Sequence, residues 1–464
     1  MMHLSRSRRS IRESYPEQAG RTTTGPSPPR STPTTEIASE AQVLTSYAEL
    51  FRTPGTRAFS ATGFIARMPI SQLGLASLLL VSAQTGSYGL AGKVSATAAL
   101  AGAIVMPQTA RLVDRYGQAR VARPIILAGA VGWLLLALAV TEAWPTWTWF
   151  VLAAIGGGLG PSIGAMVRAR WVHVLGSGHL QRRAFSWESA VDEIVFIVGP
   201  PLATFLATGL APWAGVVVAT ALLIIGGWLF TGQTGTEPPP GGKDAPRFPS
   251  RLLLTPTFVA VALVFTCCGV AFGAIDVIVV AFAEEAGSKG VAGLILAAYA
   301  AGSLIAGLGF GIISFKRSVG AQFVVAASMF GLLAPLLLLA SNLWLCTILI
   351  FIAGFAIAPL LISATVLIER IVPPAALTEA LTWSTTSLIG GVTIGGAGGG
   401  SLVDRYGAQL SFWLPAGVAI LAAAIAIVSI PRLRFRSVQR TASRLAASLV
   451  DAPAPGVPQA ELPS

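Results

Sequence analysis

The chain contains apolar segments that are each long enough to cross the hydrocarbon core of a membrane. A spanning helix needs roughly 20 consecutive apolar residues, since its backbone polar groups must all be satisfied without water. Twelve segments approach or exceed this length: 58–82, 91–110, 122–141, 147–167, 187–208, 212–231, 252–283, 291–313, 320–340, 343–368, 380–402 and 410–430. The sequence therefore predicts an all-α polytopic membrane protein with twelve transmembrane helices.

A polar, proline-rich stretch near the middle of the chain divides these segments into two sets of six. Residues 232–251 contain three consecutive prolines and several charged side chains. We therefore expect two six-helix bundles, 58–231 and 252–430, joined by a cytoplasmic linker. Residues 1–57 are rich in Ser, Thr, Pro and Arg and lack apolar periodicity, which predicts a disordered tail. A second cytoplasmic tail is expected over 431–464.

Basic residues are distributed unevenly between the two predicted faces of the membrane. The loops that follow even-numbered helices carry fourteen Lys and Arg residues, whereas those that follow odd-numbered helices carry three. Because Lys and Arg are retained on the cytoplasmic side, we expect a multi-pass cell-membrane protein with both termini in the cytoplasm. The net charge of +11 comes mainly from these loops and the tails. We therefore expect a monomer surrounded by lipid and no nucleic-acid partner.

The two sets of helices resemble each other weakly. Gly156 and Pro161 have counterparts 198 residues later, at Gly354 and Pro359. Similar offsets relate the second helix to the eighth and the fifth to the eleventh. A parallel repeat of two six-helix halves is known among secondary transporters.

The hexapeptide Leu-Val-Asp-Arg-Tyr-Gly occurs twice, at 112–117 and 402–407. The copies lie 290 residues apart, so they are not equivalent positions of the two halves. By helix count, the first is a charged turn between the second and third helices inside the cell, and the second is a charged turn between the last two helices outside it. An inverted three-helix repeat nested in each half relates such loops.

The first copy of the hexapeptide carries a family resemblance. Residues 110–120 read Ala-Arg-Leu-Val-Asp-Arg-Tyr-Gly-Gln-Ala-Arg. They resemble the major facilitator superfamily pattern of Gly, three residues, Asp, a basic residue, any residue, Gly and further basic residues, although Ala110 replaces the first glycine and only Arg120 remains of the basic pair. Gly199-Pro200 is similar to the core of a drug-antiporter motif in that family. The resemblance, over residues 58–430, implies two six-helix bundles and secondary transport.

The resemblance also implies a gating role for the hexapeptides. In the family, the loop that carries Asp114, Arg115 and Gly117 approaches the cytoplasmic end of the eleventh helix. Asp114 would then meet the helix N-terminus near 378–382 when the inside is closed. A carboxylate is favoured there by the helix dipole and the unpaired N–H groups.

By symmetry, we expect an outer contact between Asp404, next to Arg405, and the N-terminus of the second helix, where Lys93 lies. The alternative is that both aspartates only shape tight turns, which Gly117 and Gly407 end.

Ionisable residues inside the spans are candidates for binding substrate or protons, because charge is costly in lipid. We expect Arg67 in the first helix to pair with Asp192 or Glu193 in the fifth, since the family implies that these helices are neighbours. Glu188 shares a helix face with Asp192, while Glu193 points about 100° away. The alternative for Arg67 and Glu188 is that their charged ends reach the membrane interface.

Asp276 stands alone in the seventh helix, in its outer third, too far along the membrane normal to reach Arg67. An acid in this apolar setting could exchange a proton or attract a cationic substrate. The alternative is partial exposure at the outer mouth, near Glu284 and Glu285.

Together these features favour a proton-coupled exporter of a small organic metabolite or drug. An uptake symporter or uniporter, or a membrane sensor on the same scaffold, remains open. An enzyme is not expected, because the histidines outside the N-terminal tail, His173 and His179, share one loop and form no catalytic or metal cluster with other residues. Glycine-rich stretches at 156–160 and 390–400 lack the ending of a phosphate-binding loop and predict close helix packing instead. We therefore expect no cofactor and no metal.

Overall fold

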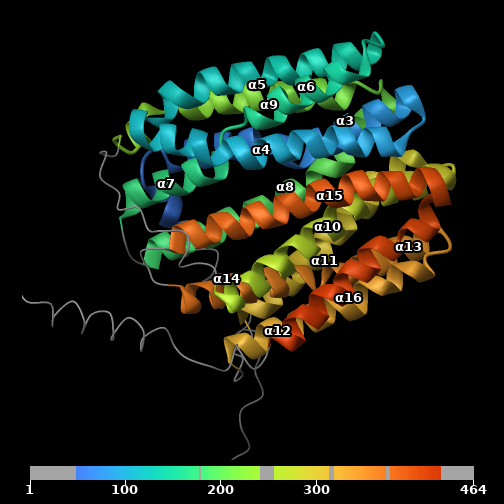
Figure 1. Ribbon diagram of the computed structural model, residues 1–464. Coiled ribbons are helices and arrows are strands. Elements are labelled where there is room, and N and C mark those ends of the chain that lie inside the picture. The colour runs from blue at the N-terminus through green and yellow to red at the C-terminus, as the bar shows by residue number, and fades with distance from the viewer. Residues whose placement is uncertain (1–48, 177–178, 241–254, 313–317, 373–376, 430–464) are drawn as a thin grey trace, which may run out of the picture. The chain divides into compact units, whose positions relative to one another are not determined.

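The computed structural model describes residues 49–176, 179–240, 255–312, 318–372 and 377–429 (Figure 1). All of them belong to one compact unit, Glu49–Ser464. All of the predicted C-terminal tail, and most of the predicted N-terminal tail and linker, lie outside the described residues. Residues 49–57 correct the prediction of a disordered tail, because they contain a 3-10 helix, Glu49–Arg52, with Leu50 buried, and the start of the helix Thr56–Arg67.

The described regular elements are all helical, which confirms the predicted all-α architecture. The first half contains η1 (Glu49–Arg52), α2 (Thr56–Arg67), α3 (Pro69–Thr85), α4 (Tyr88–Tyr116), α5 (Gln118–Thr141), α6 (Thr146–Gly158), α7 (Ile163–Leu175), α8 (His179–Gly209), α9 (Ala214–Thr231) and η2 (Thr234–Thr236). The second half contains α10 (Pro256–Glu285), η4 (Lys289–Val291), α11 (Ala292–Ile312), α12 (Val319–Leu333), η5 (Ala334–Leu339), α13 (Leu343–Gly354), α14 (Ile357–Ile371), α15 (Leu377–Ser411) and α16 (Trp413–Val428).

Ten helices or helix pairs in the described part are long and apolar enough to cross a membrane. The pair α15 and α16 passes the same test together, with a bend of 77° between them. Three predicted helices each consist of two shorter ones: α2 with α3, α6 with α7, and α13 with α14. A proline lies at or near each of these breaks. Because proline lacks a backbone N–H, it cannot continue the hydrogen-bond ladder of a helix, and this favours a break there. The structure therefore supports ten to twelve spans.

The hexapeptides are not turns, and this corrects the sequence-based expectation. α4 continues to Tyr116, beyond the predicted end at residue 110, and α15 is helical through Tyr406 rather than ending at residue 402. The chain leaves helical geometry at Gly117 (φ 95°) and at Gly407 (φ 79°). Only glycine adopts this left-handed region readily. Each hexapeptide is thus the last turn of a long helix followed by a glycine break.

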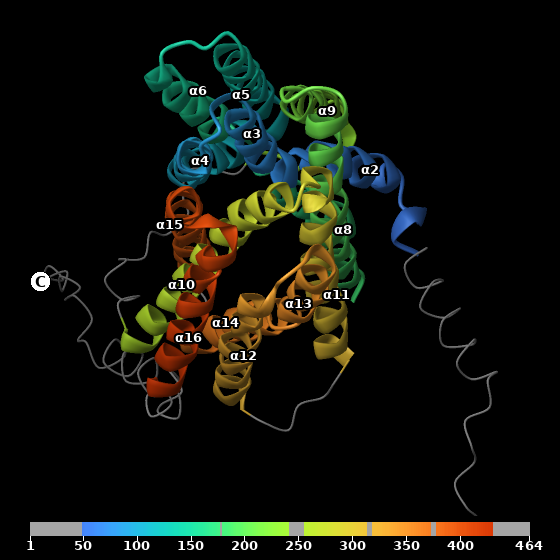
Figure 2. The same cartoon turned by 90° about the vertical axis from the view of Figure 1, so that its right-hand side faces the viewer.

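The two halves meet along two helix pairs, α4 with α15 and α8 with α11. Figures 1 and 2 both show these pairs side by side, and α10 packs against α15 and α16. We name the two ends of the unit after α4: the Tyr88 end, on the right in Figure 1, and the Gly117 end, on the left. The Tyr88 end is the one predicted to be extracellular.

The buried core shows that the halves are joined mainly at the Tyr88 end. One cluster there contains side chains of both halves, such as Leu79 and Val94 together with Ile278 and Phe412. A second cluster, which includes Phe323, is built only from the second half. The structure is therefore closed at the Tyr88 end, while the described core does not join the halves at the other end.

Glycines allow the close approach at the Tyr88 end. A Cβ atom added to Gly92 of α4 would overlap the carbonyl oxygen of Gly396 in α15, and one added to Gly400 would overlap that of Tyr88. Small residues at such positions are typical of helix packing in membranes, where contact between backbones replaces the hydrophobic driving force.

Candidate functional site

Arg67 lies at the last position of α2, directly before the break at Met68, and its side chain is buried. Its guanidinium donates to a carboxylate oxygen of Glu188 and, at 2.8 Å, to Oδ1 of Asp192, both on α8. Its Nε also donates to the carbonyl of Gly63 at 3.1 Å. Arg67 therefore does not extend to the interface but is ion-paired inside the unit.

Glu188 is the centre of this cluster, although it was not among the residues proposed for coupling. Its side chain is fully buried and accepts hydrogen bonds at Oε1 from Trp171 (2.7 Å) and Ser60 (3.2 Å), in addition to Arg67. Several donors are what a buried carboxylate needs to remain charged. In the sequence, Glu188 lies four residues before Asp192, which places both acids on one helix face. This spacing is the feature that indicates Glu188 as a further partner of Arg67.

The other side of the cluster is more accessible. Arg168 of α7 donates to Oδ2 of Asp192 at 2.7 Å, and the two side chains are 32% and 36% exposed. Two arginines and two carboxylates thus neutralise one another across α2, α7 and α8. We name Arg67, Arg168, Glu188 and Asp192 the balanced cluster.

Glu193 and Asp276 lie outside the balanced cluster. Neither carboxylate forms an ion pair with any residue in the described ranges. Glu193 is half-buried on α8. Asp276 is exposed, although its neighbours Ile275 and Val277 are at most 1% exposed.

Phe272, one turn before Asp276 on the same face of α10, makes an edge contact with the ring of Tyr299 in α11, with centroids 6.0 Å apart. Asp276 therefore lies on the α10 face that is directed toward α11. The acid is deep along the span yet accessible, rather than clustered with Glu284 and Glu285 at the end of α10.

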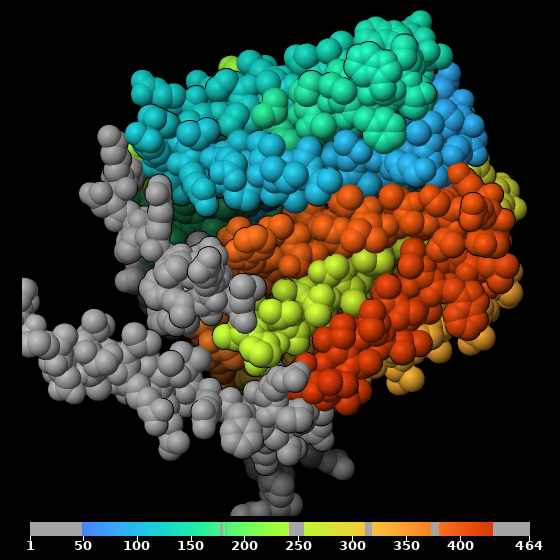
Figure 3. All heavy atoms as spheres, in the orientation of Figure 1, coloured from blue at the N-terminus to red at the C-terminus, as the bar shows by residue number. Residues whose placement is uncertain are grey.

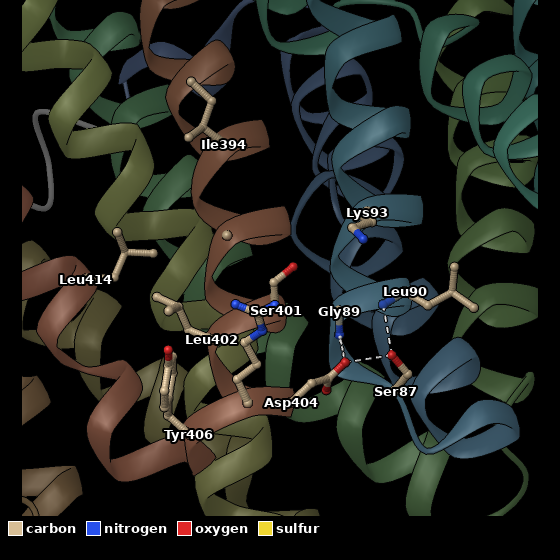
Figure 4. Close-up of a pocket in the computed structure, with 12 residues that line it drawn as sticks. Ser87, Gly89, Leu90, Lys93, Ile394, Ser401, Leu402, Asp404, Tyr406 and Leu414 are labelled. Carbon is tan, nitrogen blue, oxygen red and sulfur yellow. Dashed lines mark hydrogen bonds between the residues drawn. The ribbon is translucent and has the colours of Figure 1, made fainter.

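At the Tyr88 end, Asp404 of α15 contacts the N-terminus of α4 (Figure 4). Its carboxylate accepts hydrogen bonds from the backbone N–H groups of Tyr88 and Gly89, both at 2.8 Å, and from the Ser87 hydroxyl at 2.7 Å. The Ser87 Oγ accepts in turn from the N–H of Leu90 at 3.1 Å and is the N-cap of α4. We name this set the Asp404 contact. Because this contact joins the two halves, Asp404 does more than shape a tight turn.

A second set of contacts joins the halves nearby. The Tyr88 hydroxyl donates to Glu284, which also accepts from Lys289 at 3.1 Å. Lys289 reaches the Ser82 hydroxyl at 3.3 Å. Together with the Asp404 contact, these hydrogen bonds join the halves at the Tyr88 end. The sequence does not indicate that Ser82, Ser87, Glu284 and Lys289 take part.

At the Gly117 end, the first hexapeptide has no such partner. Asp114 is exposed and accepts no hydrogen bond from any described residue, and Arg115 lies over the ring of Tyr116, 5.1 Å from its centroid. The expected acceptor region begins where α15 begins, and the side chains of 377–379 lie outside the described part. Among the described residues, Asp114 therefore has no hydrogen-bond or ion-pair partner in this conformation.

Lys93 and Arg405 lie beside the Asp404 contact, but neither forms an ion pair within the described ranges. Both are exposed and line a groove between α4 and α15. In Figure 4, Lys93 lies farther along α4 than Gly89, apart from the Asp404 carboxylate. No three His, Cys, Asp or Glu side chains in the described part of the chain could hold a metal ion.

Comparison with known proteins adds a family and a fold. A model of the Major Facilitator Superfamily matches residues 58–275 and 261–456. No curated protein matches the chain. Among solved structures, it is similar to a mutant of the nucleoside transporter NupG, with 16% identity and a TM-score of 0.66 over 80% of this chain and 99% of that one. It is also similar to an auto-inhibited POT family peptide transporter, with 12% identity and a TM-score of 0.63 over 83% of this chain and 98% of that one.

A third similar structure is a bacterial homologue of the iron transporter ferroportin in an inward-facing state. Its identity is 12% and its TM-score 0.60, over 80% of this chain and 98% of that one. Identities this low show a shared fold and nothing about cargo.

Proposed function

Because the chain belongs to the Major Facilitator Superfamily, whose members are transporters of small solutes and not enzymes, we propose that it couples the movement of a small organic molecule to protons. We place it in the cell membrane with both termini in the cytoplasm. Transport would proceed by alternating access, in which the two halves close first at one end and then at the other. The described conformation is closed at the Tyr88 end.

The isolation of Asp276 is the main support for coupling. The balanced cluster has no excess charge, since Glu188 and Asp192 match Arg67 and Arg168. Asp276, by contrast, is an accessible carboxylate within a span with no basic partner among the described residues. Such a group must take up a proton or a cation to lower the cost of its charge in the membrane. Glu193 is the second candidate for the same reason.

Export is the direction of transport that we propose. Gly199 and Pro200, which resemble the drug-antiporter motif, lie where α8 approaches both α3 and α11. A Cβ atom added to Gly199 would overlap the Ser71 hydroxyl, and the carbonyl of Pro200 faces Gly293 of α11. This small-residue contact supports a helix that moves against its neighbours during export of an amphipathic metabolite or drug.

The coupling is tested in inverted vesicles with an imposed pH gradient, using ethidium as a cationic probe and a panel of uncharged amphipathic dyes. We expect gradient-driven accumulation of at least one probe. Asp276→Asn should abolish the dependence on the gradient while exchange of the probe without a gradient persists, because a neutral amide does not ionise and so cannot take up and release a proton during transport. Asp192→Asn should instead lower transport with or without the gradient, because it unbalances the cluster.

Two controls accompany this test. Asp276→Glu keeps the carboxylate and should retain coupling, and Glu142→Gln removes an exposed acid at the end of α5 and should behave like the unmodified protein. Probe movement that ignores the pH gradient in the unmodified protein would favour a uniporter. Full gradient dependence in Asp276→Asn would move the coupling role to Glu193, to be checked with Glu193→Gln.

A further inference from the structure

A groove of about 690 Å³ lies at the Tyr88 end, between α4 of the first half and α15 and α16 of the second. Figure 3 shows the face on which α4 (blue) and α15 (orange) lie side by side, and Figure 4 shows the groove itself. Its lining includes small residues such as Gly89, Gly398 and Ser401. The groove therefore exists only where the halves are packed together.

The lining changes in character along the groove. Ser87, Asp404 and Arg405 lie at its outer end, whereas Ile394, which is 60% exposed, and Leu414 lie farther in. Ile394 and Asp404 are ten residues apart on α15, about 15 Å along a helix that rises 1.5 Å per residue. Since α15 is part of the apolar pair α15 and α16, this direction leads from the membrane surface toward its centre. An occupant that is polar at one end and apolar along its length matches this gradient.

Two cations face the outer part of the groove, one from each half. Lys93 lies five residues into α4, roughly 7 to 8 Å from its start, and Arg405 follows Asp404 on α15. Both are exposed and without an ion pair in the described part of the chain, while the Asp404 carboxylate is engaged by Ser87, Tyr88 and Gly89. The groove therefore has an excess of positive charge at the depth where lipid headgroups meet acyl chains.

We propose that this groove binds an anionic phospholipid, with the phosphate between Lys93 and Arg405 and an acyl chain along Ile394 and Leu414. Basic pockets between transmembrane helices are suited to anionic headgroups. Since the two cations belong to opposite halves, a lipid that contacts both is bound best when the Asp404 contact is formed. The lipid thus favours the conformation closed at the Tyr88 end, as any ligand favours the state that it binds more tightly.

The test uses the full-length protein in nanodiscs, either of phosphatidylcholine alone or with phosphatidylglycerol added. Native mass spectrometry measures retained phosphatidylglycerol, and spin labels at Gln84 and Ser288, exposed positions on opposite halves, report closure of the Tyr88 end. Phosphatidylglycerol should be retained and should raise the closed fraction. Each of Lys93→Gln and Arg405→Gln should weaken retention about fivefold, the effect expected of one basic residue near an anionic lipid, and the double variant should lose both effects.

Matched controls separate specific binding from general charge attraction and misfolding. Arg120→Gln removes the same charge at the Gly117 end and should change neither readout, and Lys93→Arg should retain the lipid. The double variant should keep the unmodified distance distribution in phosphatidylcholine, which shows that it is folded. Retention and closure unchanged in the double variant would overturn the proposal. Closure induced equally by free glycerol phosphate would also overturn it, because the occupant would then be a soluble anion.

Discussion

The two copies of Leu-Val-Asp-Arg-Tyr-Gly have the same local structure but different partners. Each forms the last turn of a long helix, and each ends at a glycine with positive φ, 95° at Gly117 and 79° at Gly407. Each is followed by a helix whose N-terminus is capped by a distant glutamate. Glu237 accepts from the N–H of Ala119 at 3.2 Å, and Glu285 accepts from the N–H of Ala408 at 2.8 Å.

The aspartates of the two copies differ. Asp404 accepts three hydrogen bonds at the start of α4, whereas Asp114 accepts none from the described residues. The hexapeptide therefore presents a carboxylate in the last turn of a helix, but it does not decide whether that carboxylate accepts hydrogen bonds from the opposite half. That depends on whether the opposite half is close, which in this conformation holds at the Tyr88 end. We infer that the two copies are alternative gate contacts, formed in turn as the ends close.

The largest effect on conformation and transport is expected from a bulky side chain that prevents closure at the Tyr88 end. Gly92→Leu places a side chain where the Gly396 carbonyl lies, and overpacking of this kind costs about 1–3 kcal/mol. The label distance between positions 84 and 288 should lengthen in most molecules, and transport should fall at least tenfold, which corresponds to roughly 1.4 kcal/mol.

Gly417→Leu is the matched control, since a Cβ atom there meets nothing within 4 Å. It should leave both measurements unchanged. A distance distribution in Gly92→Leu equal to that of the unmodified protein would show that this glycine contact does not control closure.

An intermediate effect is expected from removing one aspartate at a time. Asp404→Ala deletes a carboxylate at a helix N-terminus, worth about 0.3–1 kcal/mol, so the ratio of closed to open molecules at the Tyr88 end should fall roughly two- to fivefold. Asp114→Ala should leave the resting distances at both ends unchanged, including one between labels at Arg120 and Glu369, yet slow transport. Equal shifts in the two variants would remove the distinction between the copies.

The smallest effects are expected from the two glutamate caps, which the copies have in common. Glu237→Gln and Glu285→Gln keep an acceptor but lose a charge near a helix N-terminus, so each should lower stability by about 0.3 kcal/mol, the lower end of the range for such a charge. Thermal unfolding in detergent should show similar shifts for both, with Glu142→Gln as an unshifted control. A shift in only one of them would mean that the copies already differ in local structure.

Much of the fold was predictable because its determinants are local. Apolar length predicted the helices and their order, and helix spacing predicted that Glu188 and Asp192 share a face. The continuation of α4 and α15 through the hexapeptides was missed, because charged residues at the end of an apolar run were read as a turn. In both copies a helix tolerates them until Gly117 or Gly407 ends it.

Pairing between distant residues was less predictable. Arg67 had several acids within reach, and only the rotation of α8 relative to α2 brings Glu188 and Asp192 to it and leaves Glu193 aside. The sequence equally offered no reason to place Lys289 near Ser82 or Tyr88 near Glu284, which are 207 and 196 residues apart.

The sequence by itself determined that the chain is a set of membrane helices, because backbone hydrogen bonds in lipid must be satisfied within each segment. It also supplied a glycine where each hexapeptide leaves helical geometry, and glycine adopts a positive φ at little steric cost. Only the tertiary structure decided that Asp404 accepts hydrogen bonds from the opposite half, while Asp114 accepts none from the described residues. That difference depends on which ends of the two halves touch, and identical sequences cannot encode it.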